Sequence, residues 1–171
     1  MKYISTRNKS LNYDFSSIFL RGLAPDGGLF LPNEIQKFNE NELKELSTLN
    51  YIDLGVEIIS KFCTPALDKN KIKLLLEKAY ASFDIKNIVE IKKIDNINLL
   101  ELYHGPTLAF KDIAMQVIGL MYEAINLNTK KRNIIVATSG DTGSAAISAL
   151  KEKKNINLFV LHPHEKISNI Q

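Results

Sequence analysis

Residues 133–146, NIIVATSGDTGSAA, join a β-branched run, a loop rich in glycine and hydroxyl side chains, and the start of an alanine-rich helix. This order is typical of α/β proteins with a parallel sheet. Gly140 and Gly143 permit a ligand to approach the backbone closely. Free N–H groups at the start of the following helix suit a carboxylate or a phosphate. The segment therefore predicts an anion-binding loop, and a plain strand-to-helix turn capped by Asp141 is the simpler alternative.

A second motif, HGPTLAFKD at 104–112, places one lysine at the predicted start of a helix. Cations are disfavoured at helix N-termini, so Lys111 at this position calls for a reason. The adjacent Phe110 is suited to shield the amine from water, and an amine is nucleophilic only in its neutral form. We therefore expect Lys111 to form an imine with an aldehyde; a solvated lysine in the first helical turn is the simpler alternative. We expect Asp112 to act as a cap or dipole partner and not as a catalytic acid.

Composition and charge narrow the class of protein. The chain has 171 residues, 45% of them hydrophobic and 24% charged, which is typical of a globular protein with a packed core. The net charge of +3 does not indicate nucleic-acid binding, because the sequence lacks a basic stripe with interleaved aromatic residues. The apolar runs are too short to span a bilayer, and the N-terminus lacks a secretory signal. We expect a cytoplasmic protein with no nucleic-acid partner and no membrane contact.

The spacing of possible metal ligands in this sequence gives little indication of a metal site. The single cysteine excludes an internal disulfide and a cysteine-rich metal site. His162 and His164 flank a proline, and no further ligand residues surround them in the pattern of a zinc site. The sequence therefore predicts no metal centre.

Apolar periodicity and turn residues change character near residue 90. Before it we expect strand fragments at 3–6 and 29–31, a turn at 25–28, and helices at 41–47, 51–62 and 69–83, the last capped by Asp68. After it we expect strands at 99–103, 133–137 and 157–161 and helices at 111–126 and 142–153. This β-α-β-α-β order predicts the start of an open parallel sheet whose strands are buried on both faces. The predicted fold class is α/β, with a small, mostly helical N-terminal domain at 1–90 that carries short strands and a second domain beginning at 91–171.

Taken together, the motifs resemble the threonine synthase family. Four segments carry the resemblance in this order: GLAPDGGLF at 22–30, HGPTLAFKD at 104–112, TSGDTGSAA at 138–146 and LHPHEKIS at 161–168. The lysine and glycine-loop motifs resemble the wider tryptophan-synthase-β-like group of pyridoxal enzymes. The N-terminal motif narrows the resemblance to the threonine synthase family. The resemblance implies a pyridoxal 5'-phosphate cofactor with Lys111 as its Schiff-base lysine. Residues 91–171 would then be the incomplete beginning of the pyridoxal-phosphate-dependent domain.

The resemblance also implies roles for the loop and a reaction. The residues expected to receive the substrate's α-carboxylate are Thr138, Ser139, Gly140, Asp141 and Thr142. Asp141 stands where relatives in the wider group carry an asparagine close to the cofactor's 3-hydroxyl. The implied reaction converts O-phospho-L-homoserine and water to L-threonine and phosphate, with Lys111 moving protons at the substrate carbons.

Two alternatives stay open, namely another pyridoxal-phosphate lyase of the same architecture and a non-catalytic relative that acts as a binding protein. Members of the resembled family are longer, and their glycine-rich loop for the cofactor phosphate and their hydroxyl partner at the pyridine nitrogen lie in a part not found here. Glu165 and Lys166 also stand where relatives have Gly-Arg. We therefore expect the 171-residue chain alone to bind the cofactor weakly, if at all, and not to turn over substrate.

Overall fold

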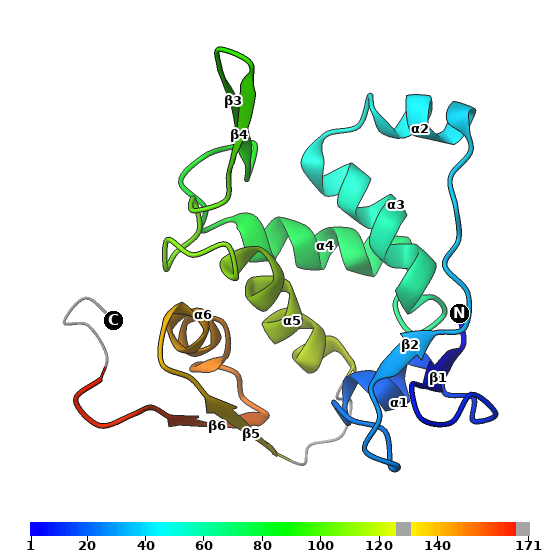
Figure 1. Ribbon diagram of the computed structural model, residues 1–171, viewed down its shortest axis with the longest axis vertical. Coiled ribbons are helices and arrows are strands. Elements are labelled where there is room, and N and C mark those ends of the chain that lie inside the picture. Colours follow the sequence, from blue (N-terminus) through cyan, green and yellow to red (C-terminus); the bar gives the residue numbers. More distant parts are fainter. Residues whose placement is uncertain (126–130, 167–171) are drawn as a thin grey trace. The chain divides into compact units, whose positions relative to one another are not determined.

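The computed structural model describes residues 1–125 and 131–166 and divides into two compact units, Met1–Leu76 and Glu77–Gln171 (Figure 1). The first unit is mostly helical, and the second contains a parallel pair of strands with helices. Helix α4 (Lys69–Tyr80) runs through the boundary between them. Among the described residues no helix has the length and apolar character needed to cross a membrane. The chain is therefore a mixed α/β protein, as its sequence predicts.

The first unit combines a small antiparallel sheet with short helices. Its elements are β1 (Tyr3–Ser5), α1 (Phe15–Phe19), β2 (Phe30–Pro32), α2 (Glu40–Leu46), α3 (Tyr51–Cys63) and the start of α4. Capping explains the helix starts: the side chains of Asn39, Asn50 and Asp68 each accept a hydrogen bond from a backbone N–H three residues later. The predicted helices at 41–47 and 51–62 and the Asp68 cap are confirmed. The predicted third helix ends earlier than expected, at Tyr80 and not at residue 83.

The N-terminal glycine motif forms a tight turn with a structural purpose. The Asp26 carboxylate accepts hydrogen bonds from the Ser5 hydroxyl at 2.7 Å and the Gly28 N–H at 2.9 Å. Gly27 has a φ of +75°, a backbone conformation that glycine adopts without strain. A Cβ on Gly28 would overlap the Ser5 hydroxyl. The turn therefore fastens β1 to the segment that leads into β2.

The second unit begins with a hairpin that the sequence did not predict. Strands β3 (Glu90–Ile94) and β4 (Ile97–Glu101) pair antiparallel through a two-residue turn in which Asp95 has a φ of +51°. The prediction that a strand at 99–103 begins the parallel sheet is therefore wrong. The physical reason is that β4 satisfies its backbone hydrogen bonds with its neighbour in sequence.

The remaining elements of the second unit follow the predicted order. Helix α5 (Asp112–Ile125), strand β5 (Arg132–Ala137), helix α6 (Asp141–Leu150) and strand β6 (Ile156–Leu161) come in succession, and β5 and β6 pair in parallel. Within the described residues the parallel sheet contains these two strands, and not the predicted three. The expected last residue of the helix at 111–126 lies outside the described residues.

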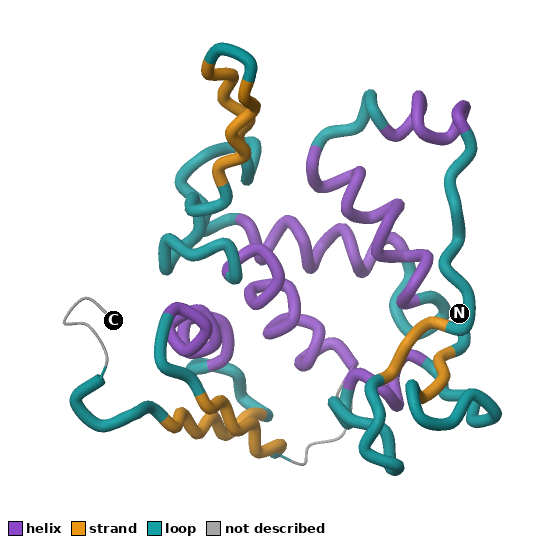
Figure 2. Tube along the Cα trace, in the orientation of Figure 1, coloured by secondary structure: helices purple, strands orange, loops and turns teal. Residues whose placement is uncertain are grey.

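Helix α6 covers one face of the parallel pair (Figure 2). The packed side chains are Ala146, Ala149 and Leu150 of α6 with Ile134, Val136, Ile156 and Leu158 of the strands. The opposite face is open: Ile135, Phe159 and Leu161 are 67%, 52% and 60% exposed. The prediction of strands buried on both faces is therefore wrong for this chain. Alternate residues of the β-branched run point to opposite faces of the pair, and helix α6 covers one of these faces.

Candidate functional site

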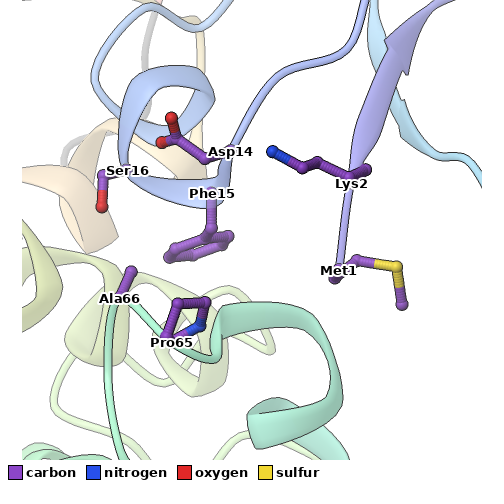
Figure 3. A pocket seen from close by; sticks show the side chains of 7 residues that line it. All are labelled: Met1, Lys2, Asp14, Phe15, Ser16, Pro65 and Ala66. Atoms are coloured by element: carbon purple, nitrogen blue, oxygen red, sulfur yellow. The ribbon is translucent and has the colours of Figure 1, made fainter.

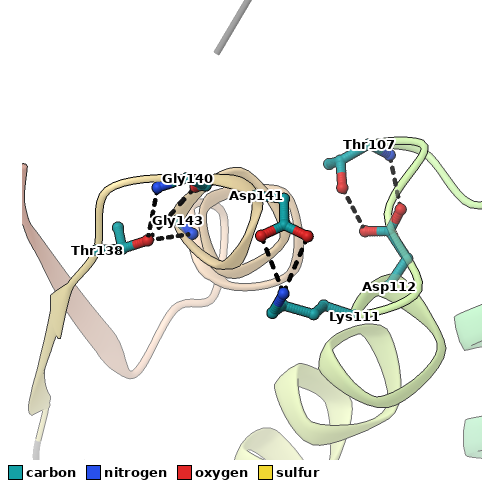
Figure 4. Close-up of polar contacts among 7 residues, drawn as sticks. All are labelled: Thr107, Lys111, Asp112, Thr138, Gly140, Asp141 and Gly143. Atoms are coloured by element: carbon teal, nitrogen blue, oxygen red, sulfur yellow. Dashed lines mark hydrogen bonds and ion pairs between the residues drawn. The ribbon is translucent and has the colours of Figure 1, made fainter. Parts of the chain in front are cut away.

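Lys111 and Asp141 meet at the N-termini of two helices. Lys111 directly precedes α5, and Asp141 is the first residue of α6. The Lys111 Nζ lies 2.9 Å from both carboxylate oxygens of Asp141 (Figure 4). The side chain of Lys111 is 26% exposed and that of Asp141 is 48% exposed, so the amine can be reached from solvent. The structure therefore brings together the two predicted motifs, which are about thirty residues apart in sequence.

Phe110 contributes to the same contact. The Lys111 Nζ lies 4.3 Å from the centre of the Phe110 ring, within the range of a cation–π interaction. The ring face and the Asp141 carboxylate both attract a cation. In the described structure the amine is therefore held as the partner of an ion pair.

The same pair acts on the carboxyl group of Asp141. The hydrogen bond donated by Lys111 lowers the pKa of Asp141, and partial burial opposes this effect. The charge of the Lys111 ammonium and nearby backbone N–H groups lower the pKa further. Asp141 is therefore a carboxylate at neutral pH and accepts hydrogen bonds without donating one.

A buried carboxylate holds the loop in front of Lys111. Asp112 is fully buried and accepts hydrogen bonds from both the N–H and the hydroxyl of Thr107, each at 2.8 Å. A Cβ on Gly105 would lie 2.5 Å from the Asp112 Cβ, so the loop passes the carboxylate without room for a side chain. Asp112 therefore fixes the loop that precedes α5. As an acidic residue in the first turn of the helix it has the position expected of a dipole partner, whereas its oxygens accept hydrogen bonds from Thr107 of the loop, so it does not have the geometry expected of a cap. Sequence periodicity gives no signal for its contact with Thr107.

Thr138 organises the glycine loop from within. Its hydroxyl oxygen accepts hydrogen bonds from the N–H groups of Gly140 and Gly143, both at 3.2 Å. A Cβ on Gly143 would lie 2.4 Å from the Thr138 methyl carbon. Close packing against Thr138 therefore requires glycine at 143. The predicted approach of a ligand to this loop stays a prediction.

The start of α6 also differs from a strand-to-helix turn capped by Asp141, which is the simpler alternative for this loop. Gly140 occupies the N-cap position and Asp141 is the first residue of the helix. A first-turn N–H of the helix, that of Gly143, donates a hydrogen bond to the Thr138 hydroxyl of the preceding loop. The interpretation of Asp141 as a cap is therefore wrong. From the first position of the helix its carboxylate accepts hydrogen bonds from Lys111 and interacts with backbone N–H groups of the first turn.

An open hollow of about 490 Å³ adjoins Lys111. Its lining is Leu102, Phe110, Lys111, Ile113, Ala114, Met115 and Thr142. Its accessible lining is almost entirely apolar, which suits the flat face of an organic ring. The sequence did not single out Leu102, Ile113 or Met115, because apolar residues at helical spacing indicate core packing first.

The first unit has a hollow of its own, with little chemistry in it. This space has a volume of about 450 Å³. Figure 3 shows the side chains that line it, namely Met1, Lys2, Asp14, Phe15, Ser16, Pro65 and Ala66. The Asp14 carboxylate already accepts the Ser17 N–H at 2.8 Å as the cap of α1. The second unit therefore holds the stronger candidate site.

The fold and the site together define an α/β protein in which a lysine and a glycine-rich loop meet at the N-termini of two helices. Residues 2–80 match the family described as "Threonine synthase N terminus". The chain is a relative of the threonine synthases and corresponds to their N-terminal portion.

Individual relatives support this assignment along the whole chain. The chain is 40% identical to a threonine synthase of Methylobacillus glycogenes, covering 100% of the chain and 38% of that protein. It is 39% identical to threonine synthase-like 2 of Xenopus laevis, covering 100% of the chain and 37% of the relative. The crystal structure of PLP-bound threonine synthase from Brucella melitensis matches with a TM-score of 0.91 at 35% identity, over 99% of this chain and 37% of that one. The chain thus spans well under half the length of these relatives.

Proposed function

We propose that this chain supplies the lysine-bearing part of a pyridoxal-phosphate-dependent threonine synthase site. The reaction is the conversion of O-phospho-L-homoserine and water to L-threonine and phosphate. The observation that carries the proposal is the Lys111–Asp141 pair at the edge of an apolar hollow. The family relationship and the PLP-bound relative support the choice of cofactor.

The described residues fit one side of a pyridoxal group. Lys111 offers a partly exposed amine, and Leu102, Ile113 and Met115 offer apolar walls for a ring. The carboxylate of Asp141 is placed to hold a hydroxyl group beside that amine, because it is ionised and within reach of Lys111. When bound, the cofactor supplies the electron sink for chemistry at the substrate carbons.

Each residue of the site has a distinct task in this proposal. Lys111 removes and returns protons at the substrate carbons, and Asp141 holds the amine in position between these steps. The loop from Thr138 to Thr142 receives the substrate's α-carboxylate at the N-terminus of α6. Ser139 and Thr142 take the larger share of this contact, because the Thr138 hydroxyl accepts two backbone N–H groups and donates its own proton to the Gly140 carbonyl at 3.4 Å.

Another pyridoxal-phosphate lyase of the same architecture is the second candidate. The relative named threonine synthase-like 2 is 39% identical to this chain, nearly the same as the threonine synthase of Methylobacillus glycogenes at 40%. The two candidates share the lysine site and differ in the product they release. A non-catalytic binding role is a third candidate, and it predicts no covalent capture of the cofactor at Lys111.

Covalent trapping tests the lysine assignment. The chain is mixed with pyridoxal phosphate, reduced with borohydride and mapped by peptide mass spectrometry, with Lys111→Arg as the matched variant. We expect Lys111 to carry the largest share of the label, and Lys73, which pairs with Asp53 at 2.7 Å, to serve as an internal reference lysine. Equal labelling of Lys111 and Lys73 would count against the site.

Product analysis tests the reaction. Threonine and phosphate are assayed with O-phospho-L-homoserine, first for the 171-residue chain and then for a polypeptide joined to the remaining part of a threonine synthase. We expect turnover in the joined polypeptide and none in the chain alone, because relatives contribute well over half of their length from outside the matched region. Phosphate release without threonine would favour the second candidate.

A further inference from the structure

A second cluster of ligand-type side chains lies at the base of the β3–β4 hairpin. Glu90 and Glu101 face each other across the two strands, and His104 follows Glu101 by three residues. The side chain of Glu101 is 6% exposed and that of His104 is 12% exposed. Burial of this kind is costly for polar groups that have no partner.

Two buried atoms of this cluster point to a common ligand. Glu101 Oε2 and His104 Nε2 form an ion pair at 3.3 Å, and among the described residues neither atom has a further hydrogen-bond partner. Two atoms bound tetrahedrally to one zinc ion at about 2.0–2.1 Å lie roughly 3.3 Å apart. The spacing therefore equals that of two ligands on one cation.

Glu90 provides the third ligand atom. One carboxylate oxygen from each glutamate and a ring nitrogen of His104 lie within 4.8 Å of one another. Glu90 is exposed, so its side chain can move toward the other two without disturbing the core. One imidazole and two carboxylates form a donor set that suits zinc better than magnesium, which prefers oxygen ligands in an octahedral arrangement.

We propose that Glu90, Glu101 and His104 form a binding site for a divalent cation of the zinc type. The site differs from the Lys111 site and does not depend on the proposed function. The backbone carbonyl of His104 also accepts the Asp84 N–H at 2.9 Å. The cation would therefore tie the base of the hairpin to the start of the loop that leads to Lys111.

Lys92, through its ammonium group, would compete with a bound cation for the Glu101 carboxylate. Its Nζ lies 2.9 Å from Glu101 Oε1, and its side chain is 51% exposed. Tyr103 also hydrogen-bonds the Glu101 carboxylate. If the cluster is a structural ion pair, removal of Lys92 weakens the fold and creates no affinity for zinc. If the cluster is a cation site, removal of Lys92 strengthens zinc binding because a repelling charge is lost.

Zinc titration against a chromophoric chelator tests the proposal on the 171-residue chain. We expect one zinc ion per chain and no competition from magnesium. Glu101→Gln and His104→Gln should each weaken zinc binding by about 100-fold or more, since loss of an outer-shell partner alone costs about 10–100-fold. Lys92→Gln should tighten binding several-fold.

Matched variants keep the test decisive. His164 lies 3.5 Å from Glu165 in an exposed pair, so His164→Gln should leave zinc affinity unchanged. Glu90→Gln alters an exposed residue and should weaken binding even if a change at the buried Glu101 impairs folding. Unchanged zinc affinity in Glu90→Gln and His104→Gln, or a zinc affinity that Lys92→Gln does not raise, overturns the proposal.

Discussion

Gly119 of α5 lies against the backbone carbonyl of Ala149 in α6, and a Cβ at 119 would be 2.5 Å from that oxygen. The helices therefore approach one another at a point where no side chain fits between them. Beside this contact the Gln116 amide donates to the Ser148 hydroxyl at 3.1 Å. Because Lys111 precedes one helix and Asp141 begins the other, their 2.9 Å contact depends on this close packing.

Gly119→Ala tests the importance of this helix contact. Alanine gains about 1 kcal/mol in helix propensity over glycine. The overlap with a backbone oxygen outweighs this gain, because relief requires movement of a whole helix. We expect a net loss of about 1–3 kcal/mol in the free energy of unfolding, measured by urea denaturation.

Gly55→Ala in α3 is the matched control. The nearest atom to a Cβ at Gly55 is the end of the Leu76 side chain, at 3.0 Å, which can rotate away. This variant should therefore be neutral or slightly stabilised. Equal destabilisation of the two variants would contradict the account given for Gly119.

The sequence predicted the elements whose signals are local. The helices around 51–62 and 69–83 follow from apolar spacing and caps, and the strand–loop–helix order around Gly140 follows from its glycines and β-branched neighbours. The sequence also places Lys111 and Asp141 each at the start of a helix, and the structure adds the 2.9 Å contact between them.

The sequence could not predict which strands pair with one another or which side chains meet across the chain. The apolar run in β4 looks like a buried strand of the central sheet, and the Asp95 turn pairs it with β3 instead. The contact of Asp112 with Thr107 and the meeting of Glu90 with His104 join side chains that share no periodic pattern. The predicted domain boundary near residue 90 and the roles of the loop residues stay predictions.

Gly143→Ala, with a rescuing change at Thr138, tests the packing inside the glycine loop. A methyl at 143 would overlap the Thr138 methyl carbon at 2.4 Å, and should lower stability by about 1–3 kcal/mol. Thr138→Ser removes that methyl and retains the hydroxyl that accepts two N–H groups. The double variant should therefore recover most of the loss in urea denaturation. An additive loss in the double variant would show that the overlap is not the cause.

Acidification tests the turn at Asp26. Hydrogen bonds from the Gly28 N–H and the Ser5 hydroxyl lower the pKa of Asp26. Its ionised form therefore stabilises the fold at pH values above its ordinary pKa near 3.8, and this contribution is lost as the pH falls through the lowered pKa of the folded state. We expect Asp26→Asn to be less stable than the parent chain near neutral pH, with the difference shrinking on acidification.

Added salt distinguishes the stabilisation at Asp26, which comes from hydrogen bonds, from the stabilisation by an exposed ion pair. Asp53 also has a lowered pKa, through the hydrogen bond donated by Lys73. The effect of Asp53→Asn on the urea midpoint should shrink in roughly 1 M salt, because an exposed ion pair is screened. The effect of Asp26→Asn should persist, since its main partners are uncharged. A common salt response of both variants would contradict the assignment at Asp26.

Asp112→Asn tests whether the buried carboxylate positions Lys111. The two donors of Thr107 need two acceptor oxygens, and an asparagine offers one oxygen and one N–H₂ group. We expect a loss of about 1–3 kcal/mol in stability and a slower rate of borohydride labelling at Lys111. Thr107→Ala removes the hydroxyl donor, so the double variant should lose less stability than the sum of the two single changes. Strictly additive losses, or an unchanged labelling rate in Asp112→Asn, would show that this contact does not position the lysine.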